Sequence, residues 1–153
     1  MKNNTDEYSA GAILYTIIDK QIYYLLIKDF HYNWGFPKGH LENNETTIEA
    51  AYREIKEEVN IKPTIDDSFC EELIYKLPNG INKHSIYFLA YYENQEATKQ
   101  IEEVQEIKLL KYEDALNTLT FDNMKQVLIK ANKYLCTNLT NVLGHFCTKL
   151  TNV

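Results

Sequence analysis

The chain has 153 residues, 44% of them hydrophobic, which is the size and composition of one globular domain with its own core. Its net charge of −6 argues against broad binding to nucleic-acid backbones, because that mode needs a basic surface. No run approaches the roughly 20 apolar residues that span a bilayer, and the first residues lack the basic-then-apolar order of a signal peptide. We therefore expect a soluble, cytoplasmic protein without a membrane partner.

The patterning of the chain predicts a mixed sheet with helices packed on it. Runs rich in β-branched and aromatic residues predict strands, and the first two, separated by Asp19-Lys20-Gln21, predict a hairpin. The expected strands span residues 10–18, 22–28, 69–77, 84–92 and 104–110. Apolar spacings of three and four predict helices over residues 47–59 and 121–135. Strands flanked by helices predict the α/β fold class.

We assign residues 1–135 to one domain and residues 136–153 to a C-terminal tail. Within the tail, CTNLTNV at 136–142 recurs as CTKLTNV at 147–153, a period of eleven residues. The apolar residues of the tail can share one helix face, but threonine, asparagine and glycine are poor helix formers. The sequence leaves open an ordered extra helix or a frayed end, and it does not indicate an oligomeric state.

The use of basic residues singles out one position. Of the 16 basic residues, 15 are lysines and only Arg53 is an arginine. A guanidinium group presents a rigid fork of donors that an ammonium group cannot copy. The lone arginine therefore predicts a bidentate contact at Arg53.

The segment from residue 39 to residue 61 reads GHLENNETTIEAAYREIKEEVNI. Thr46 and Glu49 have the spacing of a capping box, which predicts that a helix starts near Thr47. Apolar residues at spacings of three and four form the face of that helix that we expect to be buried. They are Ile48, Ala51, Ile55 and Val59.

Three glutamates project together from the same helix. Glu54, Glu57 and Glu58 occupy positions i, i+3 and i+4, so they form one acidic patch beside the apolar face. Each such pair of like charges destabilises a helix by about a few tenths of a kcal/mol. One interpretation is a solvated acidic face. The other is a site for a hard cation such as Mg²⁺, which prefers carboxylate oxygens as ligands.

The wider spacing favours the cation site. Gly39 is followed after five residues by Glu45 and, after seven more, by REIKEEVNI at residues 53–61. This order resembles the Nudix box: Gly, five residues, Glu, seven residues, then Arg-Glu-aliphatic-any-Glu-Glu-any-Gly-aliphatic. Every specified position matches except Asn60, where the box has glycine. Asparagine is the next most tolerated residue in a left-handed turn, so we expect this exchange to be conservative.

The resemblance implies an α/β/α sandwich with a mixed sheet and the Nudix loop–helix–loop. It implies that Glu54, Glu57 and Glu58, with Gly39 beside them, hold Mg²⁺ or Mn²⁺ ions. A metal that bridges two phosphoryl groups neutralises the oxygens that gain charge as water attacks phosphorus, and it also acidifies that water. The expected activity is that of a pyrophosphohydrolase, which cleaves phosphoanhydride bonds.

The resemblance also implies supporting roles. Arg53 would hold a glutamate by a bidentate hydrogen bond, and Glu45 would help to fix the loop before the helix. In families of this kind the general base comes from the box or from a later loop. Glu103, just before the strand expected at 104–110, is our candidate for a base from a later loop, and the adjacent Glu102 is the alternative.

Residues on both sides of the box resemble one Nudix branch, the asymmetrical diadenosine tetraphosphate hydrolases. The sequence HYNWGFPKGH at 31–40 contains the tryptophan, the proline and the Pro-Lys-Gly-His that precede the box in that branch. The sequence KHSIYFLA at 83–90 is similar to its Lys-x-x-x-Tyr-aromatic-Leu-Ala strand. The resemblance covers roughly residues 10–135 and stops before the repeated tail.

This branch implies candidate substrate contacts. Lys38 and Lys83 can meet a polyphosphate as point charges, and Tyr87 offers a ring on which adenine can stack. The plain alternatives are a solvated lysine at 38 and a core aromatic at 87. His31 is a further candidate for contacting phosphate and Tyr134 a further candidate for stacking, whereas we expect the Trp34 side chain to be a packing anchor.

The predicted reaction is Mg²⁺-dependent attack by water on diadenosine tetraphosphate, giving ATP and AMP. One alternative keeps the enzyme class but changes the substrate to the 5′ end of RNA, a damaged nucleoside triphosphate or a nucleotide sugar. A different class is a nucleotide-sensing module without turnover, against which the retained glutamates of the box argue. The expected partner is a small nucleotide, and nucleic acid is expected only as an RNA 5′ end.

Overall fold

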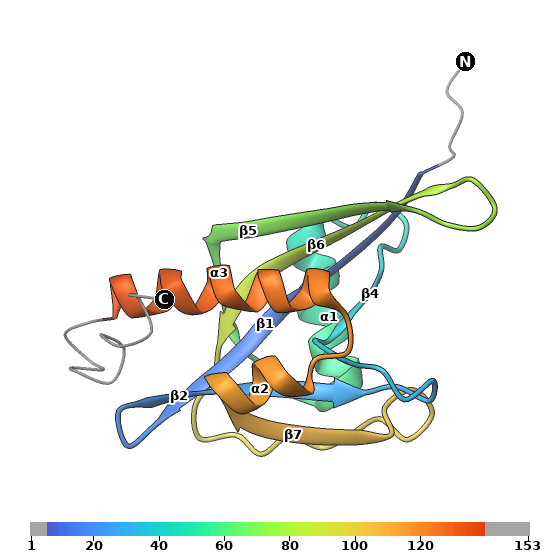
Figure 1. Ribbon diagram of the computed structural model, residues 1–153. Helices are drawn as coiled ribbons and strands as arrows, with labels where there is room; N and C mark the ends of the chain where they lie inside the picture. The colour runs from blue at the N-terminus through green and yellow to red at the C-terminus, as the bar shows by residue number, and fades with distance from the viewer. Residues whose placement is uncertain (1–5, 140–153) are drawn as a thin grey trace.

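The computed structural model of the protein describes residues 6–139, which fold into one sheet flanked by three helices (Figure 1). In chain order the elements are β1 (Asp6–Ile18), β2 (Gln21–Lys28), β3 (Trp34–Gly35), β4 (Lys38–His40), α1 (Thr47–Val59), β5 (Thr64–Lys76), β6 (Asn82–Tyr91), β7 (Glu106–Lys111), α2 (Tyr112–Thr118) and α3 (Asp122–Asn138).

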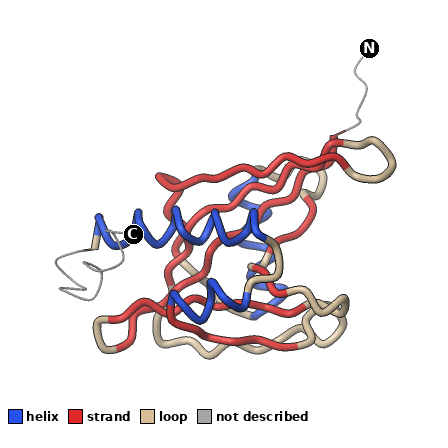
Figure 2. The backbone as a smooth tube through the Cα atoms, in the orientation of Figure 1, coloured by secondary structure: helices blue, strands red, loops and turns tan. Residues whose placement is uncertain are grey.

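The sheet is mixed, as the sequence predicts. Its main path runs β3-β2-β1-β6-β5, with β4 added on β1 and β7 added on β2. The long central strands β1 and β6 run parallel over ten residue pairs, from Asp6 opposite Asn82 to Tyr15 opposite Tyr91. Every other pairing is antiparallel. Figure 2 shows how the strands form the middle of the molecule while loops gather at its ends.

Successive residues of β1 point to opposite sides of the sheet. Because helices cover both sides, the sheet is buried on both faces. Ala12 and Leu14 pack with α1 in one core, whereas Ile13 and Tyr15 pack with α2 and α3 in the other. Figure 1 shows α1 behind the sheet and the other two helices in front of it. This is the α/β/α sandwich implied by the sequence. Its helices cover the faces of the sheet, so the edges of the layers remain accessible for a binding site.

The strands of the predicted hairpin are confirmed as β1 and β2, with Ile18 paired to Gln21. The turn is one residue shorter than predicted, because Asp19 and Lys20 alone connect the strands, both in the left-handed region with φ of 51° and 62°. Strands β3 and β4 and helix α2 are missing from the prediction. The two strands are only two and three residues long, so neither shows an alternation that a sequence pattern can reveal.

Helix α1 has the bounds and the N-terminal cap predicted from the sequence. The Thr46 hydroxyl accepts from the Glu49 N–H at 3.1 Å, and the Glu49 carboxylate accepts from the Thr46 N–H at 2.9 Å. The helix ends at Asn60, which has a left-handed φ of 58° and whose N–H donates to the Lys56 carbonyl. The Lys56 ammonium group also donates to the Asn60 side-chain oxygen at 2.5 Å.

The C-terminal helix α3 continues to Asn138, three residues beyond its predicted end. Most of the repeated tail lies outside the described residues, so the boundary at 135 and the choice between an extra helix and a frayed end stay predictions. Among residues 6–139, no helix is long and apolar enough to cross a membrane.

The end of α1 allows a matched pair of substitutions. Asn60→Ala keeps a Cβ in a left-handed conformation and removes the acceptor for Lys56, so we expect it to lower the free energy of unfolding by about 1 kcal/mol. Asn60→Gly removes the conformational cost and should leave stability equal or higher. Urea denaturation of the parent and both variants measures this, and an alanine variant as stable as the parent would contradict it.

Candidate active site

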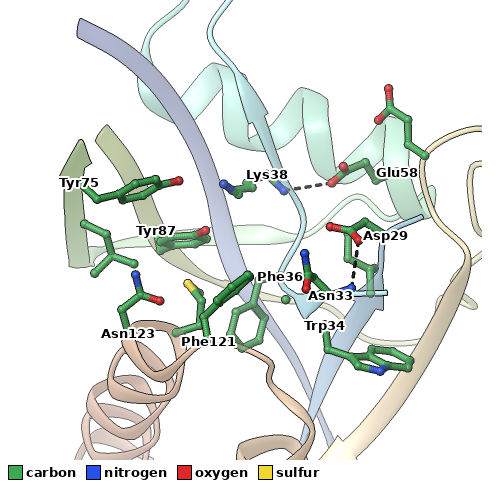
Figure 3. Close-up of a pocket in the computed structure, with 15 residues that line it drawn as sticks. Asp29, Asn33, Trp34, Phe36, Lys38, Glu58, Tyr75, Tyr87, Phe121 and Asn123 are labelled. Atoms are coloured by element: carbon green, nitrogen blue, oxygen red, sulfur yellow. Dashed lines mark hydrogen bonds between the residues drawn. The ribbon is translucent and has the colours of Figure 1, made fainter. Parts of the chain in front are cut away.

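A pocket of about 530 Å³ is lined by residues of β2 to β6, of the C-terminal part of α1, of the loop before β7 and of the start of α3. Its walls are largely aromatic and aliphatic, with a few polar and charged groups (Figure 3). They are formed by Ile27, Asp29, Asn33, Trp34, Gly35, Phe36, Lys38, Glu58, Leu73, Tyr75, Tyr87, Glu103, Phe121, Asn123 and Met124. A mainly apolar pocket with a few converging polar groups is typical of a small-molecule site.

Three carboxylates meet at the pocket, and two of them, Glu58 and Glu103, line it. Glu54 and Glu58 of α1 and Glu103 of the loop before β7 each offer an oxygen, and these oxygens lie within 4.8 Å of one another. The two helix residues are buried, with 8% and 7% of their surface exposed, whereas Glu103 is exposed. Carboxylate oxygens gathered on one side of an open pocket are a donor set that fits a hard divalent cation.

The loop that carries Glu103 is anchored on the end of α1. The N–H groups of Thr98 and Gln100 donate to the carbonyls of Val59 and Glu58, both at 3.0 Å. Such carbonyls have no partner within their own helix. The Glu103 N–H in turn donates to the Gln100 side-chain oxygen at 2.8 Å. These bonds explain why a glutamate 45 positions after Glu58 in the sequence lies beside it.

Burial and mutual repulsion disturb the protonation of the cluster. Desolvation, followed by the charge of Glu54, raises the pKa of Glu58 to about 8. Desolvation likewise raises the pKa of Glu54, although hydrogen bonding from Arg53 opposes it. Neighbouring carboxylates in a poorly hydrated site disfavour the charged form. A divalent cation offsets this cost, so the cluster is better suited to holding a metal than to standing alone.

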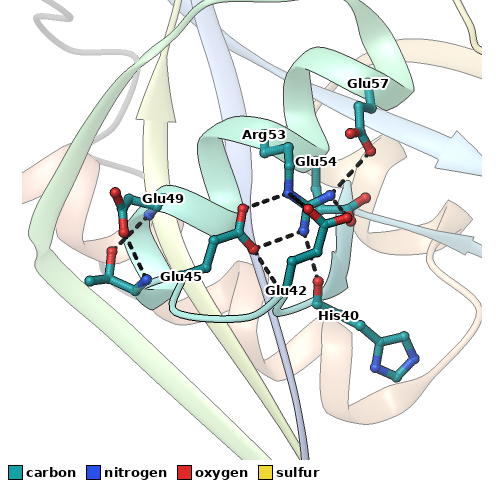
Figure 4. Close-up of polar contacts among 8 residues, drawn as sticks. His40, Glu42, Glu45, Glu49, Arg53, Glu54 and Glu57 are labelled. Carbon is teal, nitrogen blue, oxygen red and sulfur yellow. Dashed lines mark hydrogen bonds and ion pairs between the residues drawn. The ribbon is translucent and has the colours of Figure 1, made fainter.

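Arg53 makes the bidentate contact that the lone arginine predicts, but its partner is Glu45 (Figure 4). Its Nε and Nη2 donate to the two oxygens of Glu45 at 2.6 and 3.0 Å. Its Nη1 donates to Glu54 at 2.8 Å and to Glu57 at 3.2 Å, and Nη2 also donates to the His40 carbonyl at 2.8 Å. One guanidinium group therefore links the loop, β4 and the helix.

Glu57 is exposed and is not one of the three carboxylates whose oxygens lie within 4.8 Å of one another. Its carboxylate accepts from Arg53 Nη1 at 3.2 Å, the same nitrogen that donates to Glu54. Glu54 and Glu58 thus gather with Glu103, while Glu57 shares the Arg53 guanidinium group with Glu54. Its role as a metal ligand stays a prediction.

Gly39 lies in β4 directly against α1. A Cβ atom at this position would overlap the Glu54 carboxyl group, so only glycine allows β4 to approach that closely. The residue before it, Lys38, donates its backbone N–H to Glu58 at 3.0 Å (Figure 3). The strand thus holds both buried carboxylates from one side, while its own pairing with β1 fixes its position.

The two candidate phosphate-binding lysines occupy different surroundings. Lys38 lines the pocket next to Glu58. Lys83 is buried, does not line the pocket, and donates to the Ser9 hydroxyl at 2.6 Å and contacts His40 Nδ1 at 3.2 Å. Burial, followed by the charge of Lys38, lowers the pKa of Lys83. Lys38 therefore lies at the site, whereas Lys83 is buried outside the pocket lining.

Tyr87 fits both interpretations of its sequence position, a core aromatic and a ring at the ligand site. It is only 2% exposed and belongs to the core cluster, yet it also lines the pocket. Two other aromatic residues of the pocket are more exposed than Tyr87 and were not predicted from the sequence. They are Tyr75 of β5 and Phe121 before α3, which are 39% and 51% exposed. Neither lies in a recognisable motif, because only the folding of β5 beside β6 and of α3 across the sheet brings them to one pocket.

The remaining two candidates do not line the pocket. His31 is exposed on the loop after β2, where its N–H donates to Asp29 Oδ1 at 2.8 Å. Tyr134 lies far along α3 from Met124, about 15 Å at the rise of a helix. Its hydroxyl donates to Asp66 Oδ2 at 2.8 Å and its ring packs against Phe69. In this arrangement Tyr134 ties α3 to β5.

Comparison with known proteins places this site in a family. The NUDIX domain model matches residues 7–130, which include the box and the pocket. The chain belongs to the Nudix family. The family and the α/β/α fold implied by the sequence are thereby confirmed, and so is the class of enzyme, a Nudix pyrophosphohydrolase. Nudix hydrolases generally use divalent metal ions, with which the acidic cluster agrees.

Relatives of this Nudix protein include bis(5′-nucleosyl)-tetraphosphatases and RNA pyrophosphohydrolases. The asymmetrical bis(5′-nucleosyl)-tetraphosphatase of Caenorhabditis elegans is 31% identical over 132 residues, covering 83% of this chain and 95% of that protein. A crystal structure of a C. elegans Ap4A hydrolase binary complex has a TM-score of 0.80 at 30% identity, covering 86% and 98%. An RNA pyrophosphohydrolase of Psychrobacter cryohalolentis is 35% identical over 68 residues, covering 42% and 39%.

The contact between Gly39 and Glu54 can be tested on the protein alone. Gly39→Ala places a methyl group against the carboxylate, so we expect overpacking to cost about 1–3 kcal/mol of stability. Displacement of Glu54 should weaken Mn²⁺ binding by at least tenfold. Thermal unfolding and titration calorimetry measure the two effects. Gly35→Ala is the control, because a Cβ there meets nothing within 4 Å; equal behaviour of the two variants would contradict the assignment.

Proposed function

We propose that this protein is a divalent-cation-dependent hydrolase of dinucleoside polyphosphates that converts diadenosine tetraphosphate and water into ATP and AMP. The observation that carries the proposal is the joining of two parts in one pocket: an acidic cluster and partly exposed aromatic rings. The name of the C. elegans relative supports the same substrate class. We further propose a cytoplasmic location, since the substrate is an intracellular nucleotide.

The aromatic end of the pocket fits a nucleoside. Tyr75 and Phe121 present partly exposed rings, and Tyr87 lies between them and the carboxylates (Figure 3). Stacking of a base on an aromatic side chain contributes about 1–3 kcal/mol. Asn123 at the start of α3 adds an amide that can both donate to and accept from a base edge.

The acidic end fits the polyphosphate. Glu54, Glu57 and Glu58 of the same helix would hold Mg²⁺ or Mn²⁺. Gly39 leaves the space that the Glu54 carboxyl group occupies. A bound cation would neutralise phosphate oxygens and lower the pKa of attacking water. Lys38 supplies a positive charge inside the pocket, on the path from the aromatic rings to Glu58.

In the proposed reaction a water oxygen forms a bond to phosphorus, and the bridging oxygen of the cleaved phosphoanhydride leaves with the other nucleotide. Glu103 takes a proton from that water, because it is the exposed member of the cluster and its loop is fixed on α1. Arg53 does not reach the reacting atoms in this proposal. It acts as a positioning residue by holding Glu54 and Glu45 in place.

A second candidate substrate is the 5′ end of RNA, favoured by the bacterial RNA pyrophosphohydrolases that match part of the chain. That similarity covers less than half of each protein, and the chain carries a net charge of −6. A long nucleic acid would meet a surface of the wrong sign beyond its first nucleotides. The nucleotide-sensing alternative is disfavoured because the full set of box glutamates is present.

A panel of candidate substrates tests the substrate class. We expect the purified protein with Mg²⁺ to release AMP and ATP in equal amounts from diadenosine tetraphosphate. Triphosphorylated RNA, oxidised nucleoside triphosphates and a nucleotide sugar should be cleaved at least tenfold more slowly, and chromatography of the products measures each rate. Faster release of pyrophosphate from the RNA would replace our proposal by the second candidate.

Two adjacent glutamates separate a catalytic role from a general effect of charge. Glu103→Gln should lower kcat by roughly 100-fold or more, as expected for loss of a general base. Glu102→Gln removes the same charge one residue earlier, outside the carboxylate cluster, and should stay within about threefold of the parent. Steady-state kinetics on the dinucleotide measure both. Equal losses in the two variants would show that the loop contributes only its charge.

A further inference from the structure

At one end of the pocket, Trp34 of its lining is flanked by two lysines that lie outside the lining. Trp34 lines the pocket, and the ammonium groups of Lys28 and Lys108 lie 5.5 and 5.0 Å from the centroid of its ring. The same Lys28 lies 5.7 Å from the ring of Tyr32. Three strands, β2, β3 and β7, converge to place these groups together.

The charge of this group is only partly neutralised. Lys28 forms an ion pair with Glu106 at 3.2 Å. Among the residues that the structure describes, no carboxylate lies within ion-pair distance of Lys108, which is exposed. In a chain of net charge −6, a cation held over an indole ring at the border of a pocket is a local site for an anion.

The neighbouring loop presents Tyr32 in a strained conformation. Tyr32 has a left-handed φ of 64°, which is uncommon for a bulky side chain, and 69% of its surface is exposed. Asp29 fixes this loop by accepting from the N–H groups of His31 and Asn33 at 2.8 and 3.0 Å. Strain that the surrounding structure maintains is concentrated at functional sites in proteins.

The position of this group relative to the rest of the pocket suggests its ligand. Figure 3 shows Tyr75 and Trp34 at opposite ends of the lining residues, with Lys38 and Glu58 above and between them. A nucleoside at the Tyr75 end and a polyphosphate at Glu58 leave the Trp34 end for whatever follows the polyphosphate. Trp34 is held there by Thr120, whose hydroxyl accepts from the backbone N–H of Trp34 at 2.8 Å.

We propose that Trp34, Tyr32, Lys28 and Lys108 form an outer subsite for the second nucleoside of a dinucleoside polyphosphate, with the base stacked on the aromatic rings and its adjoining phosphate at the lysines. This inference rests on the proposed function. Trp34 packs against the core, as expected from the sequence, and it also lines the pocket, so the proposal adds a ligand contact to its packing role. The outer subsite distinguishes a ligand with two nucleosides from one that ends in phosphate.

Direct binding tests the outer subsite without turnover. Trp34 is the only tryptophan in the chain, so its fluorescence, excited beyond the absorption of tyrosine, reports on this subsite alone. The probes are methylene-bridged analogues of diadenosine tetraphosphate and of adenosine tetraphosphate, both titrated with Mg²⁺ present. We expect tighter binding and stronger quenching with the first probe, by roughly tenfold in affinity for one stacked base.

Tyr32→Gly separates stacking from structure. Glycine adopts a positive φ without strain, so the melting temperature should not fall. The affinity for the dinucleoside probe should fall roughly tenfold, while that for the mononucleoside probe stays unchanged. Lys108→Gln should weaken both probes, because each carries a phosphate at that position. Equal affinities of the parent for the two probes would overturn the outer subsite. A Tyr32→Gly variant that loses the same affinity for both probes would also overturn it.

The control is a similar pair on the same two strands. Lys111 of β7 lies 5.9 Å from the ring of Tyr23 on β2, at the opposite end of the β2–β7 pairing from Lys28. Lys111→Gln should bind both probes like the parent, and a loss equal to that of Lys108→Gln would mean that overall charge, not the subsite, causes the effect. Failure of the parent to cleave the dinucleotide despite selective binding would refute the proposed function while leaving the outer subsite supported.

Discussion

The structure depends on the burial of two carboxylates, Glu54 and Glu58, on one side of a short helix. Such groups are costly to remove from water, and the raised pKa of Glu58 reports that cost. The protein limits it with donors placed close by: the Arg53 guanidinium for Glu54 and the Lys38 N–H for Glu58. The remaining charge is left facing the pocket. A site that is incompletely compensated by the protein alone is one that favours a cation.

The single arginine explains how one side chain can hold so much of this arrangement. Arg53 reaches Glu45, Glu54 and Glu57 and also the His40 carbonyl, which requires donors that diverge in one plane. A lysine ammonium group cannot meet these acceptors at once. Because Arg53 satisfies Glu45 with two bonds, the loop before α1 is fixed to the helix, and β4 is held against Glu54 where only glycine fits.

Local features of the site were predictable from the sequence, and long-range ones were not. The capping box, the bounds of α1 and the left-handed Asn60 follow from contacts within a few residues, which a sequence displays directly. Glu103 was identified from the family resemblance, yet its place beside Glu58 depends on hydrogen bonds between a loop and a helix end. Tyr75 and Phe121 have no local pattern at all. They become neighbours of the site only through the stacking of sheet and helix.

The two ends of the pocket are chemically unlike, and this asymmetry follows from the elements that build them. The Tyr75 end is formed by β5, β6 and the start of α3, so it is largely apolar, and its Tyr75 and Phe121 rings are partly exposed. The Trp34 end is formed where β2, β3 and β7 reach the surface, so its rings are accompanied by lysines. A ligand with a nucleoside on each side of a polyphosphate would meet an aromatic wall at the Tyr75 end and a cationic aromatic wall at the Trp34 end. Hydrolysis between them would then release two products held by different forces, one mainly by stacking and one also by charge, which salt weakens.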